Sequence, residues 1–207
     1  MLFPCNLGIN LFLNSSETLI ENLIENINLV FDSFFYNIFL NNLSMDSNDL
    51  ETSGREEGKQ NNIQLNKTVL VYPTNLFYKS LNKIQNDCYL VPLKLGITDL
   101  PLYSSTNSNL IFLYGEANVS QRLALVSTYN LQDFQTILQN KHDILDMRII
   151  KESIHEIGHI ILGVDHCIDT SCVMNYSKNL EKVDNKSIFL CNSCLEKLEE
   201  IRENYNF

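Results

Sequence analysis

Short apolar stretches with strand-like character recur through the first 130 residues. The pattern predicts strands over 8–13, 67–73 and 89–98, where β-branched and aromatic residues gather between turn formers. Residues 109–131 predict two more strands around a loop at 115–121. Pro92 interrupts the 89–98 stretch, so we expect that strand at a sheet edge or at a bulge. A short helix is expected over 76–85.

Helical spacing replaces this pattern in three longer segments. Residues 16–31 follow a Ser15/Ser16 cap with apolar residues at helical intervals. Residues 133–163 predict a long helix with His155 and His159 beside an apolar stripe. That stripe consists of Met147, Ile150, Ile154, Ile157 and Ile161. A final helix from about Ser193 is expected to bury Leu195, Leu198 and Ile201. Strands first and a long helix last predict an α+β domain.

A polar segment at 44–66 separates these patterns. It is poor in large apolar side chains and rich in turn formers, so we expect a long flexible loop. The chain before it is too short to fold alone. We therefore predict one domain over residues 1–207, with the loop as an insertion.

Composition narrows the classes of partner. The 207 residues carry a formal net charge of −10, which argues against nucleic acid or an anionic membrane as the main partner. The first residues lack a basic segment, and the apolar stretch at 27–43 contains Asp32 and several asparagines. We therefore expect a soluble intracellular protein of the cytoplasm or nucleus. The oligomeric state is left open.

The segment HEIGHIILGVDHC, residues 155–167, carries the candidate chemistry. His155 and His159 lie one helical turn apart, so both imidazoles can reach one metal ion. Glu156 is rotated by about 100° and can reach a water on that ion. This division of labour suits metal-assisted peptide hydrolysis, with Glu156 as general base. The pattern alone is short, and a solvated polar helix face is the alternative. His142, beside charged residues, is expected to be exposed.

Four of the six cysteines crowd into residues 167–194. Cys167, Cys172, Cys191 and Cys194 form two close pairs, the spacing of a closed structural zinc site. Two disulfides or free thiols are the alternative. Adjacent side chains in an extended segment point to opposite sides, so His166 and Cys167 should serve different ions. A nucleic-acid-binding zinc knuckle is disfavoured, because the segment has only three lysines and no arginine. Cys5 and Cys88 are expected to be buried and inert.

The order of these residues resembles the archaemetzincins, a zinc-peptidase family of the metzincin clan. KESIHEIGH resembles the family's active helix, SKNLEKVDNKSIFLCNSC its cysteine segment, and LGITDLPLY and FLYGEANVSQRLALVS the preceding strands. The resemblance spans roughly residues 67–205 and implies a mixed twisted sheet above a long active-site helix, a four-cysteine zinc knuckle and a C-terminal helix. It also implies an edge strand within 109–128 that pairs with a peptide substrate.

Carried over by residue, the resemblance implies two zinc ions per chain. His155, His159 and His166 would bind the catalytic ion, with Glu156 as general base. Cys167, Cys172, Cys191 and Cys194 would hold the structural ion. Met174 would be the Met-turn residue beneath the first site. Tyr176 would either stabilise the transition state, as a tyrosine at this spacing does in some other metzincins, or simply pack. The implied activity is peptide hydrolysis, endopeptidase or aminopeptidase in mode.

One residue is out of register with a metzincin. Gly163 and His166 follow His159 by four and seven residues, one more than the clan's spacing. A π-bulge within the helix, or a turn with Gly163 in a left-handed conformation, would absorb the extra residue. If neither does, Glu181 is an alternative third ligand, or the protein is an impaired peptide-binding module that keeps only the cysteine zinc.

Overall fold

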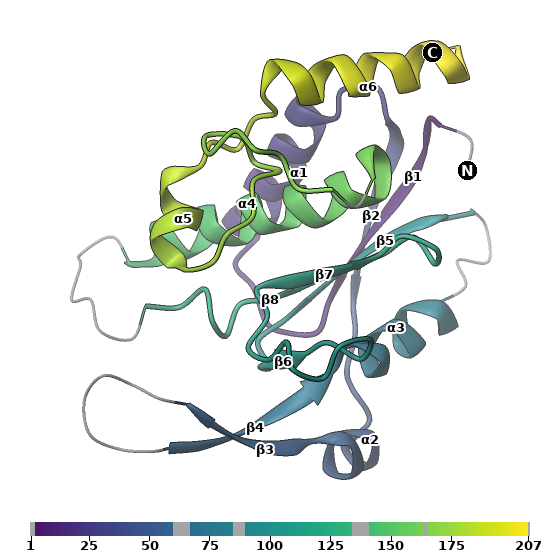
Figure 1. The fold of residues 1–207 in the computed structure, drawn as a ribbon. Helices are drawn as coiled ribbons and strands as arrows, with labels where there is room; N and C mark the ends of the chain where they lie inside the picture. Colours follow the sequence, from purple (N-terminus) through teal and green to yellow (C-terminus); the bar gives the residue numbers. More distant parts are fainter. Residues whose placement is uncertain (1–2, 60–66, 85–89, 134–140, 164, 207) are drawn as a thin grey trace.

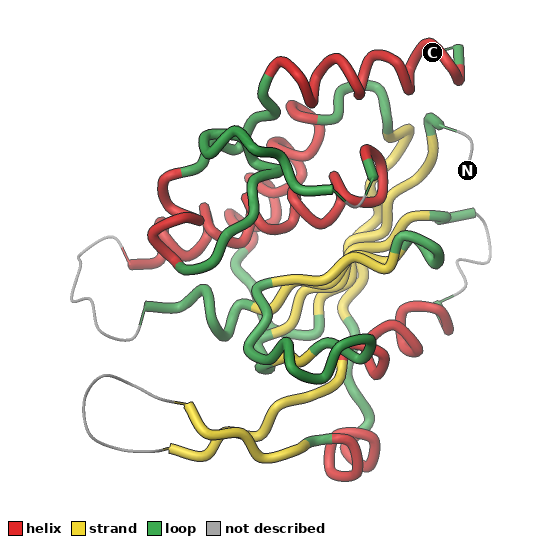
Figure 2. Tube along the Cα trace, viewed as in Figure 1, coloured by secondary structure: helices red, strands yellow, loops and turns green. Residues whose placement is uncertain are grey.

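The computed structural model describes residues 3–59, 67–84, 90–133, 141–163 and 165–206. A five-stranded mixed sheet runs through its centre (Figure 1). Its strands lie in the order β2 (Phe35–Asn42), β1 (Cys5–Leu11), β5 (Leu93–Thr98), β8 (Leu123–Ser127) and β7 (Gly115–Asn118). All neighbours are parallel except the edge strand β7, which is antiparallel to β8. The strands twist progressively across the sheet (Figure 2).

Helices cover both faces of this sheet. α1 (Glu17–Val30) and the long α4 (Lys141–Leu162) lie on one face, with α5 (Leu180–Asn185) and α6 (Asn192–Tyr205) beyond α4 (Figure 1). α3 (Thr74–Lys83) lies on the other face and packs with Leu123 and Leu125 in a second, smaller core. This confirms an α+β fold with a mixed sheet and a long helix packed on it.

The predicted helices match where an apolar stripe marks them. Ser16 caps α1, since its hydroxyl accepts a hydrogen bond from the Leu19 N–H at 3.1 Å. Ile150, Ile154, Ile157 and Ile161 of α4 are buried. Met147 is 41% exposed, so its place in the stripe was wrong, and Ile149 is buried instead. In α6, Leu198 is buried and Ile201 partly so, but Leu195 is exposed because Cys194 and Leu198 form the inward face.

Several strand predictions need correction. The 89–98 strand is central, not an edge, because β5 begins at Leu93, after Pro92. Residues 109–114, expected as a strand, form only an isolated bridge at Ile111, whereas residues 115–118, expected as loop, form the edge strand β7. The sequence GEAN has no alternation of apolar and polar residues, and all four residues are half-buried. Pairing with β8 therefore decides their conformation. β2 and α5 were not predicted. Residues 85–89, including Cys88, and residues 134–140 of the expected long helix lie outside the described residues.

The expected loop at 44–66 is wrong for residues 47–59. They form α2 (Ser47–Ser53) and β3 (Arg55–Lys59), and β3 pairs antiparallel with β4 (Lys67–Pro73). β4 in turn pairs with the short β6 (Leu102–Tyr103) in a second sheet. α2 buries none of its residues, so its sequence has no apolar stripe from which a helix could be predicted. Residues 60–66 lie outside the described part of the chain. Within that part, no helix is both long and apolar enough to cross a bilayer.

Candidate metal and active site

Three histidines converge at the C-terminal end of α4. His155 Nε2 and His159 Nε2 are 3.1 Å apart, and the ligand atoms of His155, His159 and His166 lie within 4.8 Å of one another. Two nitrogens bound to one tetrahedral zinc at about 2.0–2.1 Å are separated by about 3.3 Å. The cluster therefore fits a zinc ion, with the three imidazoles as protein ligands.

Backbone carbonyls orient the two helical imidazoles. His155 Nδ1 is 2.8 Å from the Val173 carbonyl oxygen, and His159 Nδ1 is 3.1 Å from that of Gly163. Because a carbonyl only accepts, each Nδ1 carries the proton and each Nε2 presents its lone pair to the cluster. Burial lowers the pKa of both histidines below the ordinary range, which also favours the neutral, metal-binding form.

The extra residue before Gly163 is absorbed at the helix end. α4 is α-helical throughout Lys141–Leu162, so the π-bulge, one of the two alternatives, does not form. Gly163 has a φ of +108°, and its N–H donates to the His159 carbonyl at 3.2 Å. This is the glycine exit expected as the other accommodation. Val164, the next residue, lies outside the described residues. His166 completes the cluster, and its ring packs against that of Tyr176 at 5.1 Å between centroids.

Glu156 lies beside the histidines and against β7. Burial, followed by the charge of Glu152, raises its pKa well above the ordinary carboxyl range. The strand reaches the carboxylate only because residue 115 is glycine. A β-carbon on Gly115 would lie 2.6 Å from Glu156 Oε1. No apolar pattern marked Gly115, and only the tertiary contact shows its role.

Met174 is buried against α4 at Gly158, the residue between Ile157 and His159. Its thioether occupies the space that Gly158 leaves, since a β-carbon there would be 2.3 Å from Met174 Sδ. The role of Met174 as the Met-turn residue stays a prediction.

Replacing Gly158 by alanine tests that packing. Alanine favours a helix by about 1 kcal/mol over glycine, whereas overpacking a core costs about 1–3 kcal/mol. We expect the clash to dominate, so that urea unfolding shows a lower free energy of unfolding and the histidine cluster binds zinc more weakly. Gly58→Ala in β3 is the matched control, because a β-carbon there meets nothing within 4 Å. Equal stability of the two variants would contradict the close contact.

Four cysteines form a second cluster behind the first. Cys167 and Cys191 sulfurs are 3.5 Å apart, those of Cys172 and Cys194 are 3.8 Å apart, and all four lie within 4.8 Å. Sulfurs on one tetrahedral zinc at about 2.3 Å are separated by about 3.8 Å, so this cluster also fits an ion. The Cys191 N–H donates to Cys172 Sγ at 3.3 Å. None of the four is in a disulfide.

Hydrogen bonds to backbone groups join the two clusters. The Cys167 N–H donates to the Met174 carbonyl at 2.9 Å, and the Asn175 side chain donates to the Cys167 carbonyl at 2.7 Å. The Val173 N–H donates to the Phe189 carbonyl at 3.0 Å. The carbonyl of Val173 thus orients His155, while the N–H of the same residue donates to Phe189, just before Cys191.

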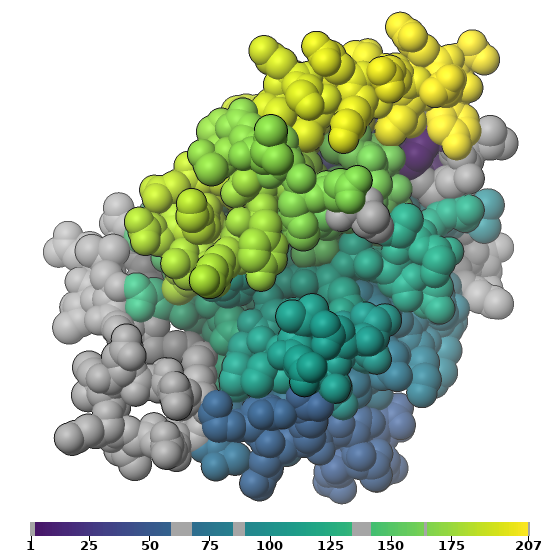
Figure 3. All heavy atoms as spheres, viewed as in Figure 1, coloured from purple at the N-terminus to yellow at the C-terminus, as the bar shows by residue number. Residues whose placement is uncertain are grey.

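A cleft of about 440 Å³ opens over the histidine cluster. α4 lines one wall with residues from Glu152 to His159, and residues 109–119, including β7, line the other. Residues 176–178 close one end. In the space-filling view the C-terminal segments, in yellow-green, border the teal residues around β7 (Figure 3). His142 is exposed, as expected, and Glu181 lies exposed on α5, outside the three-histidine group.

Comparisons with known proteins agree with this arrangement. The model of peptidase family M54 matches residues 51–200. An archaemetzincin of Methanocaldococcus jannaschii is 37% identical over 130 residues, which cover 62% of this chain and 66% of that protein. One of Archaeoglobus fulgidus is 28% identical over 171 residues, covering 78% of this chain and 98% of that one. The chain thus spans slightly under two thirds of the first of these relatives.

Solved structures share the fold. The crystal structure of archaemetzincin from Methanopyrus kandleri aligns with a TM-score of 0.68 at 21% identity, covering 96% of each chain. That of the Archaeoglobus fulgidus protein, complexed with malonate, aligns with a TM-score of 0.61 at 22% identity, covering 93% of this chain and 99% of that one. With a family model that covers most of the sequence, the chain belongs to the archaemetzincins, peptidase family M54.

Proposed function

We propose that the protein is a zinc-dependent peptidase that hydrolyses peptide bonds. The observation that carries this proposal is the convergence of three imidazoles beside a buried glutamate in an open cleft. His155, His159 and His166 would hold the catalytic zinc. When bound, that ion would supply Lewis acidity, which lowers the pKa of water and polarises a carbonyl.

Glu156 would act as the general base. Its carboxylate lines the cleft next to the metal ligands, within the space where an attacking water and a scissile carbonyl must meet. Because the Glu156 side chain is buried, bulk water has little access to its carboxylate. The contact with Gly115 limits the movement of the side chain.

The edge strand β7 would align the substrate. The Ser127 N–H donates to the Tyr114 carbonyl at 2.8 Å, and the strands continue in the register Gly115↔Val126 and Ala117↔Ala124. In an antiparallel pair the bonded positions alternate, so the backbone polar groups of Gly115 and Ala117 point away from β8 towards the open edge. An extended peptide can add to that edge by β-augmentation, in the cleft that β7 and the histidines line together.

The four cysteines would hold a second, structural zinc, giving two ions per chain. Tyr176, which packs on His166 and lines the cleft, would support that histidine by packing or assist as a transition-state donor. The impaired peptide-binding alternative was motivated by the late position of His166. The convergence of His166 with His155 and His159 supports the catalytic alternative.

Chelation tests the proposal. Protein dialysed against a chelator is expected to lose peptide hydrolysis, and one equivalent of zinc at the histidine site is expected to restore it. Cleavage of a peptide mixture is followed by mass spectrometry. Cleavage that persists without metal would contradict the proposal, as would peptide binding without turnover at saturating zinc.

A further inference from the structure

A buried ion pair lies one helical turn before the histidine cluster. Lys186 Nζ is 2.8 Å from Glu152 Oε1, and the two side chains are 1% and 4% exposed. Lys186 follows the end of α5, whereas Glu152 belongs to α4. Among the residues that the structure describes, neither charged group has another polar partner. Each of the two charged groups therefore has the other as its ion-pair partner.

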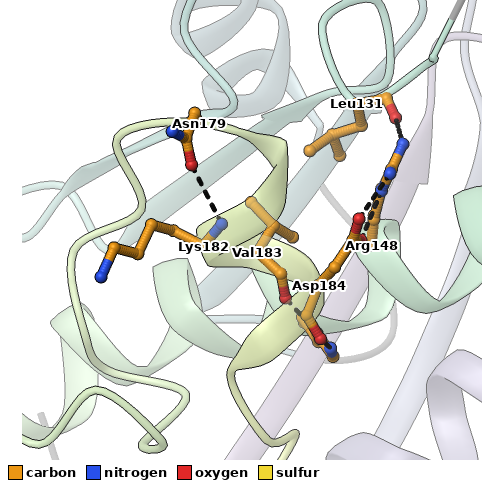
Figure 4. A network of polar contacts seen from close by, with 7 residues as sticks. Leu131, Arg148, Asn179, Lys182, Val183 and Asp184 are labelled. Carbon is orange, nitrogen blue, oxygen red and sulfur yellow. Dashed lines mark hydrogen bonds and ion pairs between the residues drawn. The ribbon is translucent and has the colours of Figure 1, made fainter.

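An ion pair and hydrogen bonds between α5 and α4 fix the position of Lys186. Arg148 binds both carboxylate oxygens of Asp184 at 2.7 and 2.6 Å and also donates to the Leu131 carbonyl at 2.8 Å (Figure 4). Lys151 Nζ donates to the carbonyls of Val183 and Asp184 at 3.0 and 2.8 Å. The chain just before Lys186 is thus anchored to α4 by two basic side chains.

Glu152 faces the cleft from this anchored position. It precedes His155 by one turn on the same side of α4 and lines the cleft together with Tyr114 and Ser177. Lys186 Nζ contacts its Oε1 at 2.8 Å. Its Oε2 has no hydrogen-bond donor within the part of the chain that the structure describes, and Glu152 lines the cleft. A nearly buried carboxylate thus keeps one acceptor that no described residue binds, in the lining of the cleft where we propose that the peptide lies.

An unpaired acceptor in such a place discriminates between substrates. A side chain that donates a hydrogen bond satisfies it, whereas an apolar side chain leaves it buried and unpaired, which is costly. A carboxylate side chain is repelled by the like charge. Lys186 partly neutralises the negative charge of Glu152. Oε2 can therefore accept a hydrogen bond from an uncharged side chain such as glutamine as well as from a cationic one.

We propose that Glu152 is a specificity-determining residue that selects peptides with a hydrogen-bond-donating side chain next to the scissile bond. Lys186 is its positioning residue, because it contacts Oε1 and leaves Oε2 without a partner among the described residues. The inference rests on the proposed peptidase function and extends it to a class of substrate.

Peptides that differ at one residue test this subsite. Each series carries glutamine, lysine, leucine or glutamate at one position flanking the cleaved bond. Cleavage by the zinc-loaded protein is measured by mass spectrometry, and binding to the Glu156→Gln variant by calorimetry. We expect glutamine and lysine peptides to be preferred over leucine by about tenfold or more, and glutamate to be the poorest.

Two variants distinguish a role of Glu152 in substrate selection from a role in stability alone. In Glu152→Gln the amide can still accept from Lys186 but presents an N–H₂ to the cleft, so the preference for donors should disappear. The double variant Glu152→Met with Lys186→Met removes both charges, a replacement that proteins often tolerate, and should prefer leucine. Glu200→Gln, exposed on α6, is the matched control and should keep the wild-type preference.

The outcomes distinguish the two proposals. Donor preference in binding and cleavage that is lost in Glu152→Gln supports the subsite. Donor preference in binding without any cleavage supports the subsite and contradicts the peptidase function. Cleavage without donor preference, a preference unchanged in Glu152→Gln, or no binding of any peptide would overturn the subsite.

Discussion

Replacing Glu156 by glutamine is expected to lower kcat/KM for peptide hydrolysis by roughly 10²–10⁴-fold, the usual contribution of a general base. Glutamine has nearly the same shape but cannot take a proton from water. It leaves the three imidazoles in place, so zinc content should remain at the wild-type level. Steady-state cleavage rates and metal analysis of the same sample provide the two readouts.

Glu181→Gln is the control for this experiment. Glu181 is exposed on α5 and lies outside the histidine group, so its variant should keep both activity and zinc. Loss of one zinc ion from Glu181→Gln would instead make Glu181 the third ligand. Undiminished hydrolysis by Glu156→Gln would remove Glu156 from the mechanism.

Replacing Cys172 by serine should damage both metal clusters. Structural zinc contributes roughly 10–16 kcal/mol in zinc-finger peptides, so loss of one ligand is expected to lower the free energy of unfolding by at least about 3 kcal/mol. At about 2–4 °C per kcal/mol for a chain of this size, the Tm should fall by about 6–12 °C. Thermal unfolding by circular dichroism measures the shift.

The same variant should also weaken zinc binding by the histidines. Cys167 directly follows His166, and the cysteine segment holds the Val173 backbone that orients His155. Cys5→Ser is the matched control, because Cys5 is buried in β1 outside both clusters. It should cost about 1 kcal/mol and leave the zinc content unchanged. A histidine site that keeps full zinc affinity in Cys172→Ser would show that the clusters are independent.

Much of this site follows from spacing along the chain. The helical interval between His155 and His159 dictates their convergence, and two close cysteine pairs make a tetrahedral cluster possible. The isoleucines at 150, 154, 157 and 161 predict the buried face of α4. Gly163 could be expected to end the helix, because glycine is the residue that adopts a positive φ without strain. Local rules suffice for these features.

Other features depend on contacts between distant segments. β7 has no apolar alternation, so only its pairing with β8 makes it a strand. Gly115 is informative only once Glu156 lies against it. The ion pair between Glu152 and Lys186 joins α4 to the chain after α5, and nothing near either residue predicts its partner. Tertiary packing decides these positions, which is why periodicity did not reveal them.

The zinc content of purified, dialysed protein tests the central claim most directly. Both clusters fit an ion, so we expect about two zinc ions per chain, falling to about one in His166→Ala. About one ion in the wild type, unchanged in His166→Ala, would mean that only the cysteines bind zinc and would contradict a catalytic metal site at the histidines.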